Sequence, residues 1–118
     1  MKAVVLTLSL LLLPWLPLAA LGAEPVAGLA RSRQDALVRM VRQDCGSCHG
    51  MKLTGGLGPA LTREALAAQP LSSISATIFH GRPGTPMPPW RSMISENEAA
   101  WIAQQLQQGF PNEPGRND

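Results

Sequence analysis

A short motif of two cysteines and a histidine limits what this chain can fold into more than any other feature. Cys45 and Cys48 lie three positions apart, His49 follows at once, and the chain has no other cysteine. In a helix, three positions correspond to about one turn, so the two thiols would lie one turn apart with the imidazole next to the second thiol. The rest of the chain must therefore fold around whatever these three side chains hold.

Three chemistries use cysteines at this spacing. A redox disulfide of the thioredoxin kind needs a strand-to-helix turn, and no Val- or Ile-rich strand lies upstream of Cys45. A zinc site needs four ligands, and only His80 would remain to complete the set. The string Cys-x-x-Cys-His is the attachment signature of c-type haem, in which thiols add to vinyl groups and the imidazole coordinates iron. The motif therefore predicts one covalent haem c, attached to Cys45 and Cys48, with His49 as the proximal ligand.

A partner for the proximal histidine is expected a few residues further on. An iron-bound imidazole usually has its other ring nitrogen held by a carbonyl, which fixes the tautomer. The segment GGLGPAL, residues 55–61, is made tight by its glycines. The carbonyl of Pro59 is the candidate acceptor for His49.

The sixth iron ligand separates an electron carrier from an enzyme, because an open position binds small ligands. The chain has five methionines, of which Met87 and Met93 are the candidates. Met87 lies in GRPGTPMPPW, residues 81–90, where prolines restrict the loop and reduce the entropy lost when the thioether is fixed. Met87 is predicted as the distal ligand, and His80 is the rival that would give a bis-imidazole site.

The first 23 residues resemble a secretory signal rather than part of the fold. Lys2, the apolar run over residues 3–13 and the small residues before Glu24 form the charged, apolar and cleavable regions of such a signal. Two prolines argue against a retained membrane anchor. We expect cleavage between residues 20 and 24, export to the periplasm, and no stable membrane insertion afterwards.

What remains after cleavage is one small domain of about 95 residues. Without Lys2 it carries nine Lys and Arg against eight Asp and Glu, so it has no large basic field and nucleic acid is excluded as a partner. The expected organisation is a signal peptide over residues 1–23, a flexible lead-in over 24–31, one domain over 32–109 and a loose tail over 110–118.

Apolar residues recur at helical spacing in four segments of this domain, which predicts an all-α fold without strands. The expected helices cover residues 32–44, 61–69, 71–81 and 95–109. The predicted starting signals are Ser32, Thr62 and a capping box of Ser95 and Glu98, and the predicted ends are Pro70, Gly81 and Gly109. Asp35 and Arg39 stand four positions apart in the favourable order, which indicates a solvated helix face.

Four segments, CGSCHG, GPAL, PMPPW and ISENEAAWIAQQL, together resemble the class I c-type cytochromes over residues 32–109. Within that family the chain is most similar to the small periplasmic cytochromes c that accompany haem d1 nitrite reductase in denitrifying bacteria. The resemblance implies a helical fold around one haem c. It also implies thioether attachment at Cys45 and Cys48 and axial ligation by His49 and Met87.

One part of the chain departs from the family pattern. Leu37 and Val41 stand where a glycine and an aromatic residue usually let the first helix cross the last one closely. Trp101 is the residue expected to compensate at this crossing.

The resemblance also implies a role. Such proteins carry single electrons to cytochrome cd nitrite reductase, or to and from the periplasmic dehydrogenase that completes haem d1. Both proteins are therefore expected partners. The chain itself is expected to be a monomer and an electron-transfer protein, not an enzyme. Two alternatives stay open: a maturation or docking factor whose redox cycle is secondary, and a haem enzyme with an open sixth site. Arg82 and Trp90, beside the ligand loop, are candidates to contact a haem propionate.

Overall fold

The computed structural model describes residues 28–115, and every regular element within that range is helical. These elements are α1 (Arg31–Met40), η1 (Val41–Cys45), α2 (Gly46–His49), α3 (Arg63–Leu66), α4 (Leu71–His80) and α5 (Glu96–Gln108). The prediction of an all-α fold without strands is confirmed for this part of the chain. The predicted signal peptide, residues 1–23, lies outside the described residues.

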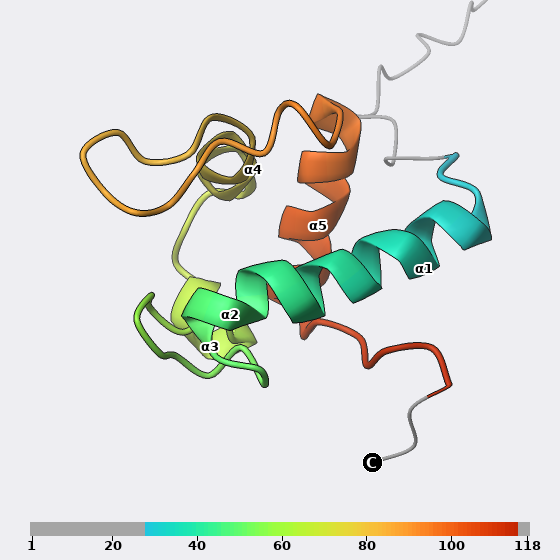
Figure 1. Cartoon of the computed structure of the whole chain (residues 1–118), viewed down its shortest axis with the longest axis horizontal. Helices are drawn as coiled ribbons and strands as arrows, with labels where there is room; N and C mark the ends of the chain where they lie inside the picture. The colour runs from blue at the N-terminus through green and yellow to red at the C-terminus, as the bar shows by residue number, and fades with distance from the viewer. Residues whose placement is uncertain (1–27, 116–118) are drawn as a thin grey trace, which may run out of the picture.

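The first three elements form one continuous helical run (Figure 1). Within it η1 is a π-helical turn, in which the amide of Gly46 donates to the carbonyl of Val41 five residues earlier. Such a turn holds one residue more than an α-helical turn and therefore changes the direction in which later side chains project. It leads into the attachment motif, because its last residue, Cys45, is the first residue of that motif.

The predicted ends of the last two helices are confirmed. Gly81 ends α4 with a backbone φ of +70°. The Ser95 hydroxyl accepts from the Glu98 amide at 3.2 Å, and the Glu98 carboxylate accepts from the Ser95 amide at 2.8 Å. This reciprocal pair is a complete capping box, and α5 then continues to Gly109, which has a φ of +94°.

The predicted start of the first helix is wrong by two residues. Ala30 is the N-cap, and its carbonyl accepts from the amides of Arg33 and Gln34 without any side-chain cap. Ser32 therefore lies inside the first turn, where its hydroxyl is not required. On the surface of this helix, Asp35 lies 3.9 Å from Arg31, one turn before it.

The second predicted helix is present but shorter than expected. Thr62 caps α3 by accepting from the Ala65 amide at 3.3 Å, as predicted. The amide side chain of Gln107 in α5 then donates to the carbonyls of Leu66, at 3.2 Å, and Gln69, at 2.7 Å. The Gln69 amide also donates to the Leu66 carbonyl at 3.0 Å, so residues 67–69 form a turn that α5 holds in place of a further helical turn.

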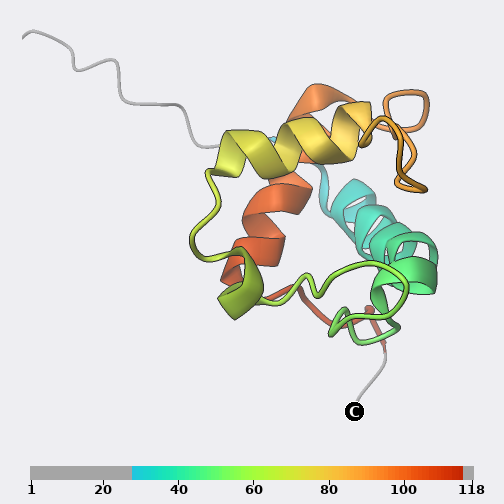
Figure 2. The ribbon, with the colours of Figure 1, turned by 90° about the vertical axis from the view of Figure 1, so that its left-hand side faces the viewer.

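The core lies where α1, η1 and α4 meet α5 (Figure 2). Leu37, Val41 and Ile102 are its largest fully buried side chains. Trp101 is 8% exposed and belongs to the same buried cluster; its expected role at the crossing of the first and last helices stays a prediction.

Arg42 in η1 holds the segment that follows α5. Its guanidinium donates to the carbonyls of Phe110, at 2.8 Å, and Pro111, at 2.8 and 3.1 Å, and to the side chain of Asn112 at 3.3 Å. It also lies 5.5 Å from the centre of the Phe110 ring, within the range of a cation–π contact. Residues 110–112, assigned to a loose tail from sequence, are thus tied to the helix that carries Cys45.

None of the helices in residues 28–115 is both long and apolar enough to cross a bilayer.

Candidate haem site

The two cysteines of the motif have different surroundings. Cys45 is partly buried and packs against the hydrophobic core, whereas Cys48 is exposed on α2. Burial, with a further contribution from the carboxylate of Asp44, raises the pKa of the Cys45 thiol to about 11. Both sulfurs come from one helical stretch, and no strand-to-helix turn of the thioredoxin kind surrounds them in the described residues.

His49, the predicted proximal ligand, is oriented by the segment that follows it. Nδ1 of His49 lies 2.7 Å from the carbonyl oxygen of Pro59. A carbonyl can only accept, so Nδ1 carries the proton and donates. The lone pair then lies on Nε2, which is the tautomer that an imidazole needs to bind iron.

Gly58 lets the backbone approach this imidazole face closely. A Cβ atom built at Gly58 would lie 2.7 Å from both Cε1 and Nδ1 of His49. The Gly58 amide also donates to the carbonyl of Cys48 at 2.8 Å, and the Gly55 amide donates to the carbonyl of His49 at 2.8 Å. Residues 50–58 therefore satisfy the last carbonyls of α2 while they position the ring.

Leu53 adds a feature that sequence reasoning missed. It is 2% exposed and has a φ of +60°, the only positive φ of a non-glycine residue in the described chain. Its amide donates to the carbonyl of Gly50 at 2.7 Å, and its carbonyl accepts from the amide of Leu61 at 2.8 Å. These two hydrogen bonds fix its backbone conformation. A left-handed leucine persists only where its surroundings determine it, and here its apolar side chain is drawn into the core.

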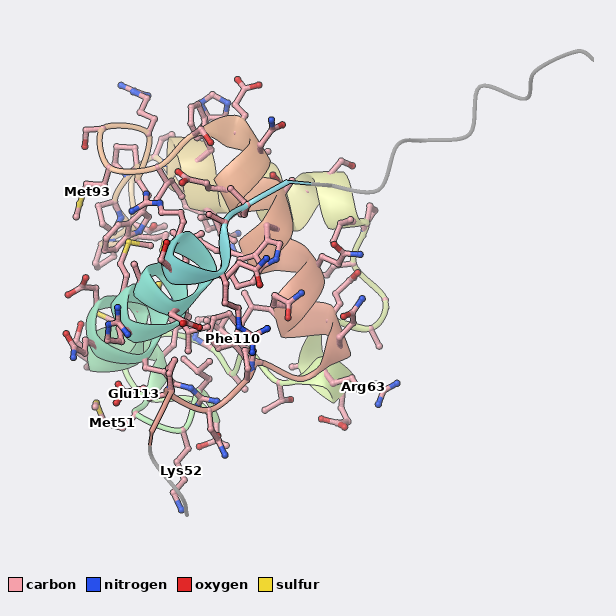
Figure 3. All side chains as sticks on the ribbon, turned by 90° about the vertical axis from the view of Figure 1, so that its right-hand side faces the viewer. Met51, Lys52, Arg63, Met93, Phe110 and Glu113 are labelled. Atoms are coloured by element: carbon pink, nitrogen blue, oxygen red, sulfur yellow. The ribbon has the colours of Figure 1, made fainter. Side chains whose placement is uncertain are left out.

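The predicted distal ligand lies in the loop between α4 and α5. Met87 is half-buried, whereas Met93 is 58% exposed and Met51 is 63% exposed. Figure 3 shows Met51 and Met93 at the periphery of the molecule, on the same side. Among these three thioethers, Met87 is the one that is withdrawn from solvent.

The other predicted ligands are also located. His80 ends α4, is exposed, and its ring meets that of Phe79 edge-on at 5.0 Å. Across residues 28–115, no three His, Cys, Asp or Glu side chains gather as a metal site would require. The zinc alternative therefore has no support in the arrangement of these residues.

Trp90 provides an independent test of whether the site fits a haem. Its indole Nε1 is buried and has no hydrogen-bond partner within the described residues. Its backbone is well held, because its amide donates to Ile78 and its carbonyl accepts from Met93 and Ile94. A buried N–H rarely stays unpaired, so this donor fits an acceptor that a bound group would bring, such as a propionate.

These observations define a class of protein. An all-helical domain with a Cys-x-x-Cys-His segment, a histidine held by a proline carbonyl and a half-buried methionine in a proline-rich loop is a small c-type cytochrome.

Comparison with known proteins gives the family. The family model described as cytochrome c oxidase, cbb3-type, subunit III matches residues 32–105. Cytochrome c55X of Pseudomonas aeruginosa is 52% identical over 100 residues, which cover 80% of this chain and 84% of that protein. Cytochrome c55X of Stutzerimonas stutzeri is 52% identical over 92 residues, 78% of each chain. The chain therefore belongs to the class I c-type cytochromes, in the family of the cytochromes c55X.

Two solved structures are similar as well. The c-type cytochrome NirC is 51% identical with a TM-score of 0.67, covering 68% of this chain and 94% of that chain. Dihydro-heme d1 dehydrogenase NirN, solved in complex with DHE, is 34% identical with a TM-score of 0.56. The match covers 64% of this chain but 16% of that larger protein, so it concerns one part of the dehydrogenase.

Proposed function

We propose that this chain is a periplasmic one-electron carrier with a single haem c. Cys45 and Cys48 attach the haem, and His49 and Met87 are its axial ligands. The observation that carries the proposal is the 2.7 Å contact between Nδ1 of His49 and the Pro59 carbonyl, which leaves Nε2 available for iron. When bound, haem c supplies an iron that changes between the ferric and ferrous states.

The residues of the chain then have separate tasks. His49, fixed in one tautomer, and Met87 would hold the iron, and the indole N–H of Trp90 would donate to a carboxylate of the bound group. Two side-chain ligands would leave no position for a substrate at the metal, which favours electron transfer over catalysis. A thioether ligand and exclusion of water both favour ferrous iron, so we expect a positive midpoint potential.

The proposed setting is haem d1-dependent nitrite reduction. The relatives include NirC and part of a dihydro-heme d1 dehydrogenase, and their names support a link to that system. The proposed partners are cytochrome cd nitrite reductase and the periplasmic dehydrogenase that completes haem d1. The segment 1–23 would direct export and then be cleaved, so that the carrier domain of residues 32–109 reaches the periplasm, where these partners are. The carrier acts as a monomer.

Mixing experiments decide between the partners. Ferrous holoprotein is mixed with oxidised nitrite reductase, and ferric holoprotein is mixed in a separate experiment with the dehydrogenase and its substrate. Haem absorbance is followed in both. Fast oxidation by the reductase supports a donor to nitrite reduction, and fast reduction by the dehydrogenase supports an acceptor in haem d1 synthesis. Slow reaction with both partners contradicts the carrier proposal.

The similarity to part of the dehydrogenase favours a second candidate, a maturation or docking factor for haem d1 whose own redox change is secondary. That candidate predicts saturable binding to the dehydrogenase that is equally tight for the ferric and ferrous forms, together with slow electron exchange.

Carbon monoxide tests the remaining alternative, a haem enzyme. Rapid binding to the ferrous protein at neutral pH would mean that the sixth position is open, whereas an occupied position makes binding slow. The visible spectrum of the reduced protein reports covalent attachment in the same sample.

A further inference from the structure

The loop that carries Met87 has few backbone groups available to hold it. Four of the ten residues in the segment 81–90 are prolines, which have no amide hydrogen. Around Met87, one backbone hydrogen bond crosses the loop, from the Arg82 amide to the Met87 carbonyl at 3.1 Å, and the Trp90 amide ties the end of the segment to Ile78 of α4 at 3.2 Å. A loop of this composition needs side-chain groups to complete its hydrogen bonding.

Thr85 supplies such a group. Its hydroxyl donates to the Arg82 carbonyl at 2.7 Å and accepts from the Met87 amide at 3.3 Å. Its own amide also donates to the Arg82 carbonyl, at 3.1 Å. One hydroxyl therefore bridges the start of the loop and the backbone of the predicted ligand.

The other side of the loop is fixed against α4. Gly81 ends that helix, and a Cβ atom built there would lie 2.8 Å from the Met87 carbonyl oxygen and 2.7 Å from Pro89 N. The loop thus contacts the end of α4 closely at Gly81, and the Thr85 hydroxyl links Arg82 to Met87 within the loop. A single substitution at Thr85 removes the hydroxyl and its two hydrogen bonds without changing the backbone.

We propose that Thr85 is a positioning residue for the distal ligand, whose hydroxyl holds the backbone of Met87 so that its thioether stays on the iron. The inference rests on the proposed ligation by Met87. Since both hydrogen bonds of the hydroxyl join backbone groups of the loop, at Arg82 and Met87, the hydroxyl acts on how firmly the sulfur is held. Loss of the hydroxyl therefore makes the sixth position easier for an external ligand to take.

The test compares Thr85→Val with Thr85→Ser in the full-length holoprotein. Valine keeps the β-branched shape without the hydroxyl, and serine keeps the hydroxyl without the methyl group. Thr62→Val is the matched control, because Thr62 also bonds a backbone amide through its hydroxyl, but at the start of α3. Imidazole titration of the ferric protein and the sulfur-to-iron charge-transfer band, followed as the temperature rises, are the readouts.

We expect Thr85→Val to bind imidazole about three- to tenfold more tightly than the wild type and to lose the charge-transfer band at a lower temperature. Thr85→Ser and Thr62→Val should match the wild type in imidazole affinity, and Thr62→Val should lose only thermal stability. If Thr85→Val folds poorly, Thr85→Ala serves as the second variant without a hydroxyl.

Two negative results are distinguishable. A wild-type protein without the charge-transfer band overturns Met87 as ligand, and with it the proposed function. A wild type with the band, together with equal imidazole affinities for wild type, Thr85→Val and Thr85→Ser, overturns the role of Thr85 alone. An equal change in Thr62→Val also overturns it, because the effect would then follow general stability.

Discussion

Gly58 leaves no room for a side chain beside the proximal imidazole. A methyl group there would lie 2.7 Å from two atoms of the His49 ring, so Gly58→Ala must displace either the ring or the Pro59 carbonyl. We expect this variant to destabilise the holoprotein by about 1–3 kcal/mol and to lower haem incorporation. Chemical denaturation and haem content per chain are the measurements.

Gly46→Ala is the matched control for that variant. It lies inside the attachment motif, but its nearest neighbour for a new Cβ atom is Met51 Cα at 3.5 Å, an ordinary contact. It should retain normal haem content. A Gly58→Ala protein that matches Gly46→Ala in both measurements would show that the close approach to the ring is not required.

Removal of the unpaired indole N–H tests the proposed role of Trp90. Trp90→Phe keeps an aromatic ring and deletes the buried donor. If that donor serves a propionate, its loss leaves negative charge near the iron less compensated, which favours the ferric form. The midpoint potential should fall by about 20–60 mV, as expected for one hydrogen bond. Equilibrium redox titration measures it, and an unchanged potential would contradict the propionate contact.

Local sequence singled out some candidate residues of the site and not others. The motif spacing and the prolines around Met87 are local patterns, and they indicate Cys45, Cys48, His49 and Met87, whose roles at a haem stay predictions. The bridging hydroxyl of Thr85 and the buried left-handed Leu53 depend on the path of a whole loop. Only the role of Thr85 had a signal in the sequence, because a threonine among prolines offers a hydroxyl that can donate and accept hydrogen bonds within the loop.

At the scale of elements, one ion pair joins the start of α1 to the start of α5. Nε of Arg33 lies 2.5 Å from the Glu98 carboxylate, which belongs to the capping box of α5. This hydrogen bond lowers the pKa of Glu98 below its ordinary value of 4.5 and raises that of Arg33. Because the folded-state pKa is depressed, the stabilisation is complete above about pH 4.5 and is lost as the pH falls through the lower folded value.

Glu98→Gln tests this pair, since its amide oxygen can still accept from Ser95. We expect a loss of roughly 0.5–1 kcal/mol at neutral pH, because Arg33 is largely solvated. The difference from wild type should shrink as the pH falls below 4.5. Denaturant titrations at several pH values measure it, with Arg33→Gln as the partner in a double-mutant cycle. A difference that is constant over the whole pH range would exclude the ion pair as its source.

Arg42 couples the segment after α5 to the helix that carries Cys45. Arg42→Ala removes the donor to Phe110, Pro111 and Asn112, and we expect a loss of about 2 kcal/mol in the free energy of unfolding. The free energy of unfolding of Arg42→Lys should lie between those of the wild type and Arg42→Ala, because lysine keeps the positive charge but not the several N–H donors of the guanidinium.

Truncation after Gly109 provides the control for Arg42. The shortened protein should be destabilised more than Arg42→Ala, because it also loses the packing of Phe110 on the core. Arg42→Ala should then cost little more in the shortened protein, since the partners of its hydrogen bonds are already gone. Additive losses in the doubly changed protein would show that Arg42 acts elsewhere.

The elements themselves were predicted where their ends have strong chemical signals. The capping box at Ser95 and the glycines at 81 and 109 fixed α4 and α5 correctly. The start of α1 was wrong, because two backbone hydrogen bonds to Ala30 replace the expected cap at Ser32. The π-helical turn of η1 could not be predicted, since no residue pattern distinguishes it from a regular helix.

At the scale of the whole molecule, the two halves of the haem site come from separate parts of the chain. The proximal half is one continuous stretch, from Cys45 to Pro59, and the distal half is the loop between α4 and α5. In Figures 1 and 2 the two lie on the same side of α5, one above the other. Long-range contacts through α5, such as those of Gln107 and Arg42, bring the halves into one domain, and single-sequence patterns carry no information on such contacts.

The backbone hydrogen bonds that shape the turn after α2 join residues of the stretch 48–61 to one another, as from the amide of Gly58 to Cys48 and from Leu61 to Leu53. The hydrogen bonding of this turn is thus internal, and Leu53 and Leu61 attach it to the core. Transferred to the end of a helix in an unrelated scaffold that buries these two leucines, the turn should supply an imidazole that is already oriented, whereas the methionine loop would lose its contact with the end of α4.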